Sequence, residues 1–255
     1  MSKSGASGST SGVQTVGSWL REVLIVVVGA LIASTLLRVF VIQMFVIPSG
    51  SMENTLIETD RIAVQKVAGF QRGDVIVFRD SLDWLSPPLP DTDPVHEVLV
   101  FIGLAPDDST NYLVKRLIGL PGDHVTCCDA QSRVTVNGVP LDETSYLYVD
   151  PVTGRKDDPS DKVFDVVVPA DHLFVMGDHR GGSQDSRCHL GQPLPGDPNG
   201  SLAFIPQSSV VGTVVAVVYP FSRFSGLSRP PTFDRVTAPG PAPDEPVIVG
   251  DRPVC

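Results

Sequence analysis

The sequence has few basic residues and few aromatic residues. Of its 255 residues, 19 are Lys or Arg and 29 are Asp or Glu, the formal net charge is -10, and aromatic residues make up 7%. No run of basic residues, no alternation of basic with aromatic residues and no zinc-finger spacing is present. Because proteins bind nucleic acids largely through the phosphates, we exclude a nucleic-acid-binding protein.

Two common signatures of hydrolases are also missing. The sequence has no Gly-x-Ser-x-Gly turn, which exposes the serine of many hydrolases, and no His-Glu-x-x-His pair of zinc ligands. A Ser-His-Asp arrangement of Ser183, His179 and Asp178 can be drawn, but without such a turn it is disfavoured. We expect His179 to make hydrogen bonds within its loop, and we expect no metal and no other cofactor.

Long apolar runs are scarce, with one exception at residues 23–47. Its uninterrupted part, residues 23–37, would extend about 22 Å as a helix, less than the roughly 30 Å of a bilayer's hydrocarbon core. Apolar residues on both sides can lengthen it, with Trp19 at an interface and the charge of Arg38 reaching the headgroups. We predict a transmembrane helix over residues 18–40 rather than a cleavable signal peptide, because no small-x-small site closes the run. Basic residues on both sides leave its orientation open.

The rest of the chain reads as short strands rich in β-branched residues and separated by Gly, Pro and Asp. This pattern predicts a mainly β fold with antiparallel sheets. The clearest strands are expected at residues 61–67, 74–78, 97–103, 112–118, 124–126, 133–136, 173–176 and 210–219. Asn137-Gly138, between two short apolar segments, predicts a hairpin turn of the primed type.

These observations divide the chain into four parts. Residues 1–17 are rich in Gly, Ser and Thr and are predicted to be a disordered tail. After the helix, residues 41–227 are expected to form the β-rich domain, with an insertion subdomain at about 125–168. Residues 228–255 are rich in proline and show little pattern, so we expect a loose tail.

The four cysteines, Cys127, Cys128, Cys188 and Cys255, all follow the predicted helix. Beyond a membrane anchor, disulfides can persist. Cys127 and Cys128 are neighbours on a probable strand, so their side chains should point to opposite faces. Our hypothesis is that one of them pairs with Cys188, and the alternative is buried free thiols.

One serine and one lysine stand out. Ser51 lies in Pro48-Ser49-Gly50-Ser51-Met52, and Lys115 lies in an apolar run, residues 113–118. An ammonium cannot accept the proton of an attacking hydroxyl, but burial can lower a lysine pKa of about 10.4 by several units. Each motif also has a simpler interpretation: Ser51 as a turn serine, Lys115-Arg116 as a charged edge strand, and residues 177–187 as a polar turn.

Together these segments resemble the bacterial type I signal peptidases, membrane-bound Ser/Lys endopeptidases that remove signal peptides from exported preproteins. The resemblance covers roughly residues 20–226 and rests on motifs in the family order, at residues 48–52, 72–78, 115–123 and 176–187. It implies a catalytic domain on the outer side of the cytoplasmic membrane, with the N-terminus inside. The partners it implies are the lipid bilayer and signal peptides with small residues at positions -3 and -1.

Carried over residue by residue, the resemblance implies that Ser51 is the nucleophile and Lys115 the general base. It implies an oxyanion hole made by the Ser51 N–H and the Ser49 hydroxyl, and a lysine-orienting role for Ser183. Supporting ion pairs are implied for Asp178 with Arg116 and for Asp185 with Arg187. The chain departs from the family pattern at Asn54, His179, Gly181 and Gly182, and none of these changes removes a catalytic group.

For the substrate pocket we name Ile47, Pro48, Met52, Leu113 and Val114, with ordinary core packing as the alternative. We also expect Phe221 and Phe224 to enter the outer leaflet of the membrane. Two rival functions stay open at this point. One is a Ser/Lys self-cleaving repressor protease of related fold, which the apolar helix and the lack of a DNA-binding module disfavour. The other is a catalytically silent membrane adaptor that binds signal peptides.

Overall fold

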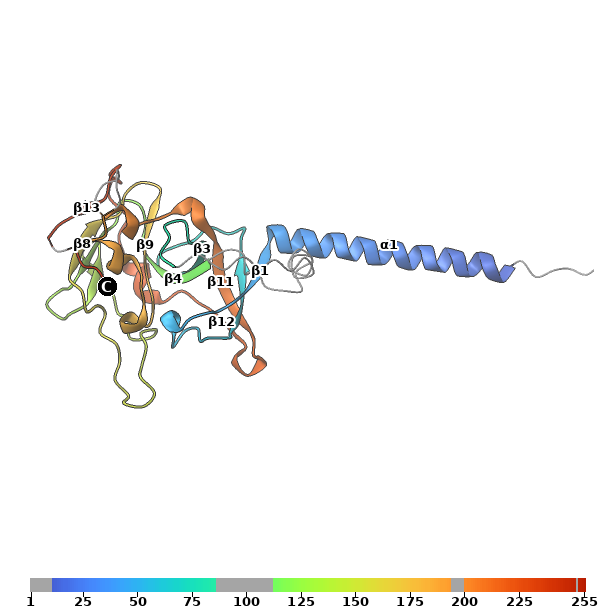
Figure 1. Cartoon of the computed structure of the whole chain (residues 1–255), viewed down its shortest axis with the longest axis horizontal. Coiled ribbons are helices and arrows are strands. Elements are labelled where there is room, and N and C mark those ends of the chain that lie inside the picture. Colours follow the sequence, from blue (N-terminus) through green and yellow to red (C-terminus); the bar gives the residue numbers. More distant parts are fainter. Residues whose placement is uncertain (1–10, 86–111, 194–199, 251) are drawn as a thin grey trace, which may run out of the picture. The chain divides into compact units, whose positions relative to one another are not determined.

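The computed structural model describes residues 11–85, 112–193, 200–250 and 252–255, and for residues 11–18 and 35–40 the helical backbone alone. The chain forms two units, Met1–Ile42 and Gln43–Cys255, and each is described here by itself (Figure 1). The predicted strand at 97–103 lies outside the described residues. The second unit is mainly antiparallel β, which confirms the predicted fold class.

The first unit consists mainly of α1 (Ser11–Phe40). Residues 11–17, predicted as part of a disordered tail, are helical in the structure. The large apolar side chains at the centre of the helix are exposed, including those of Leu24, Val26 and Leu31. Across the described residues, no helix combines the length and the apolar character that crossing a membrane requires. The transmembrane helix over residues 18–40 therefore stays a prediction.

The larger sheet of the second unit contains Lys115, and Ser51 lies in the connection between two of its strands. Its strands follow the order β1 (Ile42–Val46), β2 (Arg61–Gln65), β11 (Val210–Tyr219), β3 (Val75–Arg79), β4 (Tyr112–Gly119), β9 (His172–Met176) and β10 (Ile205–Pro206), and β12 (Ser225–Gly226) pairs with β11. In β4, which pairs with β3 at residues 112–116 and with β9 at residues 116–119, all residues after Tyr112 are buried.

The smaller sheet is built mostly from the predicted insertion. Its order is β13 (Val247–Ile248), β8 (Phe164–Val167), β5 (His124–Cys127), β6 (Val134–Val136) and β7 (Val139–Pro140). Asn137 and Gly138 turn the chain between β6 and β7 with φ of 52° and 77°, which confirms the predicted primed turn.

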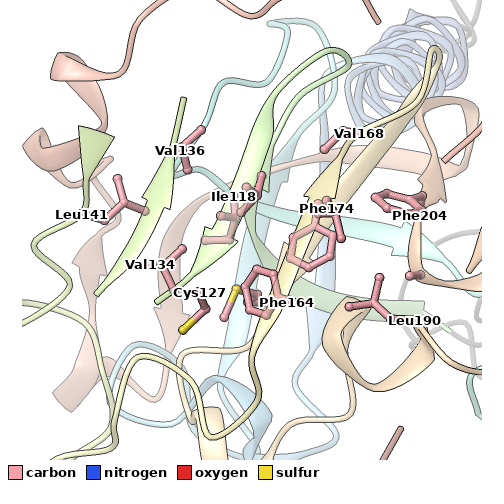
Figure 2. Packing of buried hydrophobic residues seen from close by; sticks show 14 of the residues in the cluster. Ile118, Cys127, Val134, Val136, Leu141, Phe164, Val168, Phe174, Leu190 and Phe204 are labelled. Carbon is pink, nitrogen blue, oxygen red and sulfur yellow. The ribbon is translucent and has the colours of Figure 1, made fainter. Parts of the chain in front are cut away.

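The two sheets share one hydrophobic core, so the insertion does not stand apart from the rest of the unit. Figure 2 shows Ile118 of β4 and Phe174 of β9 together with Val134 of β6 and Phe164 of β8. The rings of Phe164 and Phe174 lie 5.4 Å apart, within the range of favourable aromatic contacts. Burial of these side chains fixes the insertion against the strands that lead into the site.

Residues 228–255 are not a loose tail, and this prediction was wrong. Phe233 is 2% exposed within the shared core, and β13 pairs with β8. The Ala170 N–H donates to the Pro243 carbonyl at 2.8 Å. Proline-rich segments lack regular periodicity, but they can still bury single aromatic residues and add short strands, which a pattern search does not detect.

The predicted disulfide of Cys188 with Cys127 or Cys128 was also wrong. Cys188 pairs with Cys255, and Cys127 pairs with Cys128. The physical reason is the position of the C-terminal segment, which brings Cys255 to the 3-10 helix Ser186–His189 that contains Cys188. The disulfide with Cys255 therefore fastens this segment to the loop that contains Cys188.

Removing the Cys188–Cys255 disulfide should destabilise the second unit. The bond joins residues 67 apart in sequence. Because it closes a long loop, it restricts the unfolded chain and so adds about 2–4 kcal/mol to the free energy of unfolding. Urea unfolding of the Cys188→Ser/Cys255→Ser double variant should show a loss of this size. The matched control is Cys127→Ser/Cys128→Ser, because a bond between neighbours closes almost no loop. Equal losses for the two double variants would contradict this account.

Candidate active site

Ser51 lies in a short 3-10 helix, Gly50–Met52, that directly follows β1. The Glu53 N–H donates to the Gly50 carbonyl at 3.0 Å, and the Leu56 N–H donates to the Met52 carbonyl at 2.8 Å. Met52 and Leu56 are buried in the core beneath this turn. The apolar side chains thus fasten the turn to the sheet and leave the Ser51 side chain in a fixed position.

Lys115 lies on β4, an inner strand of the larger sheet, and is 2% exposed. Because the side chains of Lys115 and Arg116 are both buried, they do not form a solvent-exposed charged edge, and that interpretation was wrong. The Lys115 Nζ is 2.6 Å from the Ser51 Oγ and donates a hydrogen bond to it. A lysine and a serine hydroxyl are thus in direct contact in a buried environment.

The surroundings of Lys115 favour its neutral form. Burial lowers the pKa of Lys115 from 10.5 to about 8, because an ammonium group loses its hydration there. The carboxylate of Asp185 opposes this effect, and the guanidinium of Arg187 adds to it. Among the described residues, Lys115 forms no ion pair. The amine can therefore accept a proton at a pH not far above neutral.

The predicted supporting ion pairs are both formed, and both are buried. The Arg116 Nε donates to the Asp178 Oδ1 at 2.8 Å, and the Arg187 Nε donates to the Asp185 Oδ1 at 2.9 Å. Burial alone would raise the pKa of Asp185, but the charge of Arg187 and its hydrogen bonds lower this pKa to about 2. The Asp185 carboxylate therefore stays ionised beside Arg187, and the Asp178 carboxylate accepts hydrogen bonds from Arg116.

Two further predicted residues, Ser49 and Ser183, differ in their contacts with Ser51 and Lys115. The Ser49 Oγ lies 3.4 Å from the Ser51 Oγ. Ser183 is 6% exposed, and its hydroxyl makes no hydrogen bond to Lys115 in the described part of the chain. The orienting contact implied by the resemblance is thus absent from this structure.

His179 contacts the turn that carries Ser51 but not the Ser51 hydroxyl. Its Nδ1 lies 3.3 Å from the Gly50 carbonyl and 3.2 Å from the Glu53 carboxylate, and its ring stacks on Tyr148 at 3.9 Å. Its backbone N–H donates to the Ser51 carbonyl at 3.2 Å. Within the described residues this geometry favours the expected loop role over a catalytic base.

The residues named for the substrate pocket do not all come together. Ile47, Met52 and Val114 share one buried cluster, whereas Leu113 belongs to another. Neighbours on a strand point to opposite faces, which explains why Leu113 and Val114 separate. Pro48 is exposed next to the turn of Ser51.

Gly177 is a site residue that the sequence did not single out. A Cβ placed on it would lie 2.5 Å from the Ser51 carbonyl oxygen and would also overlap the Ser183 side chain. Gly177 therefore allows the loop after β9 to touch the turn of Ser51. The sequence offers one weak signal, a glycine directly after the predicted strand at 173–176, but the close approach is visible only in three dimensions.

Thr55, Glu143 and Arg180 were also missed. The Thr55 hydroxyl donates to the Asp178 Oδ2 at 2.5 Å. Arg180 and Glu143 form a third buried ion pair next to the other two. In the described residues, no group of acidic, histidine or cysteine side chains could hold a metal ion. The described chemistry is that of a hydroxyl in contact with a buried amine.

The comparisons with known proteins agree on one family. The family model "Signal peptidase, peptidase S26" matches residues 19–219. Signal peptidase I of Mycobacterium tuberculosis (strain ATCC 25618 / H37Rv) is 36% identical over 233 residues, which are 81% of this chain and 75% of that protein. Signal peptidase I S of Bacillus subtilis (strain 168) is 30% identical over 224 residues, 85% of this chain and 96% of that protein.

Among solved structures, a signal peptidase I from Enterococcus faecalis V583 matches 58% of this chain and 97% of its own. The sequence identity is 24% and the TM-score is 0.31.

Proposed function

Because this chain belongs to the signal peptidase family, peptidase S26, we propose that it removes signal peptides from preproteins with Ser51 as nucleophile and Lys115 as general base. It is a serine endopeptidase of this family. The observation that carries the proposed dyad is the hydrogen bond of 2.6 Å between the Lys115 Nζ and the Ser51 Oγ, in a site where both residues are buried.

In the proposed mechanism, the neutral amine of Lys115 takes the proton of Ser51 as the Ser51 Oγ attacks the carbonyl carbon of the scissile bond. The ammonium then gives this proton to the leaving amine. The C–N bond then breaks, and the mature protein leaves with this amine while the signal peptide stays bound to Ser51 as an ester. Water attacks the ester with Lys115 again as the base, the ester bond breaks, Lys115 returns the proton to the Ser51 Oγ, and the signal peptide is released. The lowered pKa of Lys115 supports this cycle, because the base must be neutral at its start.

The oxyanion of the tetrahedral intermediate would be bound by the Ser51 N–H and the Ser49 hydroxyl. The 3.4 Å separation of the Ser49 and Ser51 hydroxyls supports this role, since a donor must lie close to the attacked carbonyl. In other proteases, such a donor contributes about 2.7–4 kcal/mol to the stability of the transition state.

The substrate would bind as an extended peptide between two strand edges. β1, which leads to Ser51, is the last strand at one end of the larger sheet. On β4, the pairing with β9 begins at Arg116, so among the described residues no strand pairs with that edge of residues 112–115. A peptide can add to such edges through its backbone. Small residues at positions -3 and -1 would then face Ile47, Met52 and Val114.

We also propose that residues 18–40 anchor the enzyme in the cytoplasmic membrane, with the N-terminus inside and the catalytic unit outside. The exposed apolar side chains at the centre of α1 support the anchor. Phe221 and Phe224 are 81% and 67% exposed, which suits side chains that enter a lipid leaflet. Such an arrangement would keep Ser51 close to a signal peptide that is still in the membrane.

The test is cleavage of a purified preprotein by the detergent-solubilised protein. The wild type should release a product whose N-terminal sequence begins directly after a small residue. The Ser51→Ala variant should be at least about a thousandfold slower, because it lacks the hydroxyl that contacts Lys115 and that attacks the scissile bond in the proposed mechanism. A wild type that binds the preprotein without cutting it would contradict the proposal and favour the silent adaptor.

A further inference from the structure

The loop that follows β9, residues 177–187, is held in place by side chains of the insertion. The Arg180 Nη2 donates to the Glu143 Oε1 at 2.5 Å, and the two side chains are 2% and 1% exposed. The Tyr146 hydroxyl donates to the same carboxylate at 2.7 Å. The Gly181 N–H donates to the Asp157 Oδ2 at 3.0 Å. The insertion therefore contacts the loop through buried, charged groups.

Arg180 connects this contact to the nucleophile. Its Nε donates to the Gly177 carbonyl at 2.9 Å. Gly177 in turn lies against the Ser51 carbonyl so closely that no Cβ fits between them. Glu143 thus contacts Arg180, Arg180 contacts the Gly177 carbonyl, and Gly177 packs against the turn of Ser51.

The charges around the site show why Glu143 is needed. Three arginines, Arg116, Arg180 and Arg187, are buried, and two of them, Arg116 and Arg187, are paired with Asp178 and Asp185. In the described residues, the ion-pair partner of Arg180 is Glu143. Burial opposes the charge of Arg180, and the Glu143 carboxylate raises the pKa of Arg180 and keeps it ionised. Removal of one partner from such a buried pair is costly, because the other charge stays without compensation.

We propose that Glu143, which lies outside the motifs shared with the signal peptidases, is a positioning residue for the reaction. Through Arg180 it fixes the Gly177 carbonyl and thereby the place of Ser51 relative to Lys115. The inference rests on the proposed function, since it names a residue that serves the same dyad. Because Glu143 belongs to the insertion, this proposal means that the insertion supports catalysis in addition to contributing side chains to the hydrophobic core.

The test separates positioning from stability with two variants. Glu143→Gln keeps the size of the side chain but removes its charge, and it should lower Tm. It should also lower kcat at least about tenfold while KM stays nearly unchanged, since small displacements of reacting groups are costly. In Glu143→Gln/Arg180→Met no unpaired charge is left, so Tm should recover. Its kcat should stay low, because the donor to the Gly177 carbonyl is gone.

The matched control is Asp158→Asn, which removes a carboxylate from the same insertion. Asp158 pairs with Arg155 at 3.6 Å, and both side chains are highly exposed, so activity and Tm should equal those of the wild type. Wild-type kcat in Glu143→Gln, or a double variant that regains wild-type kcat, would overturn the positioning role. If Glu143→Gln does not fold, the double variant alone decides. Inactivity of both the wild type and Asp158→Asn would instead overturn the proposed function.

Discussion

The Lys115→Met variant should lose at least about a thousandfold in kcat/KM for preprotein cleavage, since removal of one member of a catalytic pair disables the whole unit. Lys115 is 2% exposed, and methionine is an unbranched apolar side chain that is one atom shorter and lacks the amine. The site should therefore stay packed. Burying an apolar group in place of a poorly hydrated amine should leave the free energy of unfolding unchanged or higher. Kinetics and urea unfolding of the same preparation measure both effects.

The dependence on pH has a definite sign. The pKa of Lys115 is lowered from 10.5 to about 8 on folding, so between these values the folded protein binds fewer protons than the unfolded chain. Wild-type stability should therefore rise with pH across this window, and activity should rise as the pH passes about 8. Lys115→Met should lose both trends.

A suitable control for this experiment is Lys162→Met. Lys162 is a partly exposed lysine that pairs with Asp161 at 3.1 Å on the insertion. Its replacement should leave cleavage and its pH dependence intact. Substantial activity in Lys115→Met would show that another group acts as the base, even if Ser51→Ala is inactive.

The Gly177→Ala variant should also be strongly impaired, although neither reacting group is changed. An added Cβ would lie 2.5 Å from both the Ser51 carbonyl oxygen and the Ser183 Cβ, and neither atom is the end of a flexible side chain. The turn of Ser51 and the loop after β9 would have to move apart. We expect a loss of about a hundredfold in kcat, because the reacting groups would separate, together with about 1–3 kcal/mol of stability.

Gly181 provides the matched control in the same loop. A Cβ at Gly181 would meet its nearest neighbour, Asp157, at 3.7 Å, which is an ordinary contact. Gly181→Ala should therefore keep nearly wild-type activity and stability. If the two alanine variants were equally active, the close approach at Gly177 would not matter for the reaction.

The sequence predicted the parts of this protein that depend on local patterns. Short segments rich in β-branched residues predicted most strands of the larger sheet, such as β11 at Val210–Tyr219, and the mainly β class is confirmed. Asn137-Gly138 predicted its turn, because only a few residues accept positive φ twice in succession. The motifs around Ser51 and Lys115 pointed to the family that the comparisons show.

Contacts between segments that are far apart in the sequence could not be predicted from local patterns. The pairing of Cys188 with Cys255, the packing of residues 228–255 and the Glu143–Arg180 ion pair join positions far apart in the chain. No periodicity links such positions, since each contact forms only when the two sheets pack on a common core.

The sequence by itself therefore determined most strands of the larger sheet, the apolar helical segment and the candidate serine and lysine, because residue type and spacing specify these locally. Only the tertiary structure decided that Lys115 is buried on an inner strand at 2.6 Å from Ser51 and that Gly177 fits against the Ser51 turn. Burial, close approach and charge compensation are properties of the packed molecule, and they set the pKa and the geometry on which the proposed reaction depends.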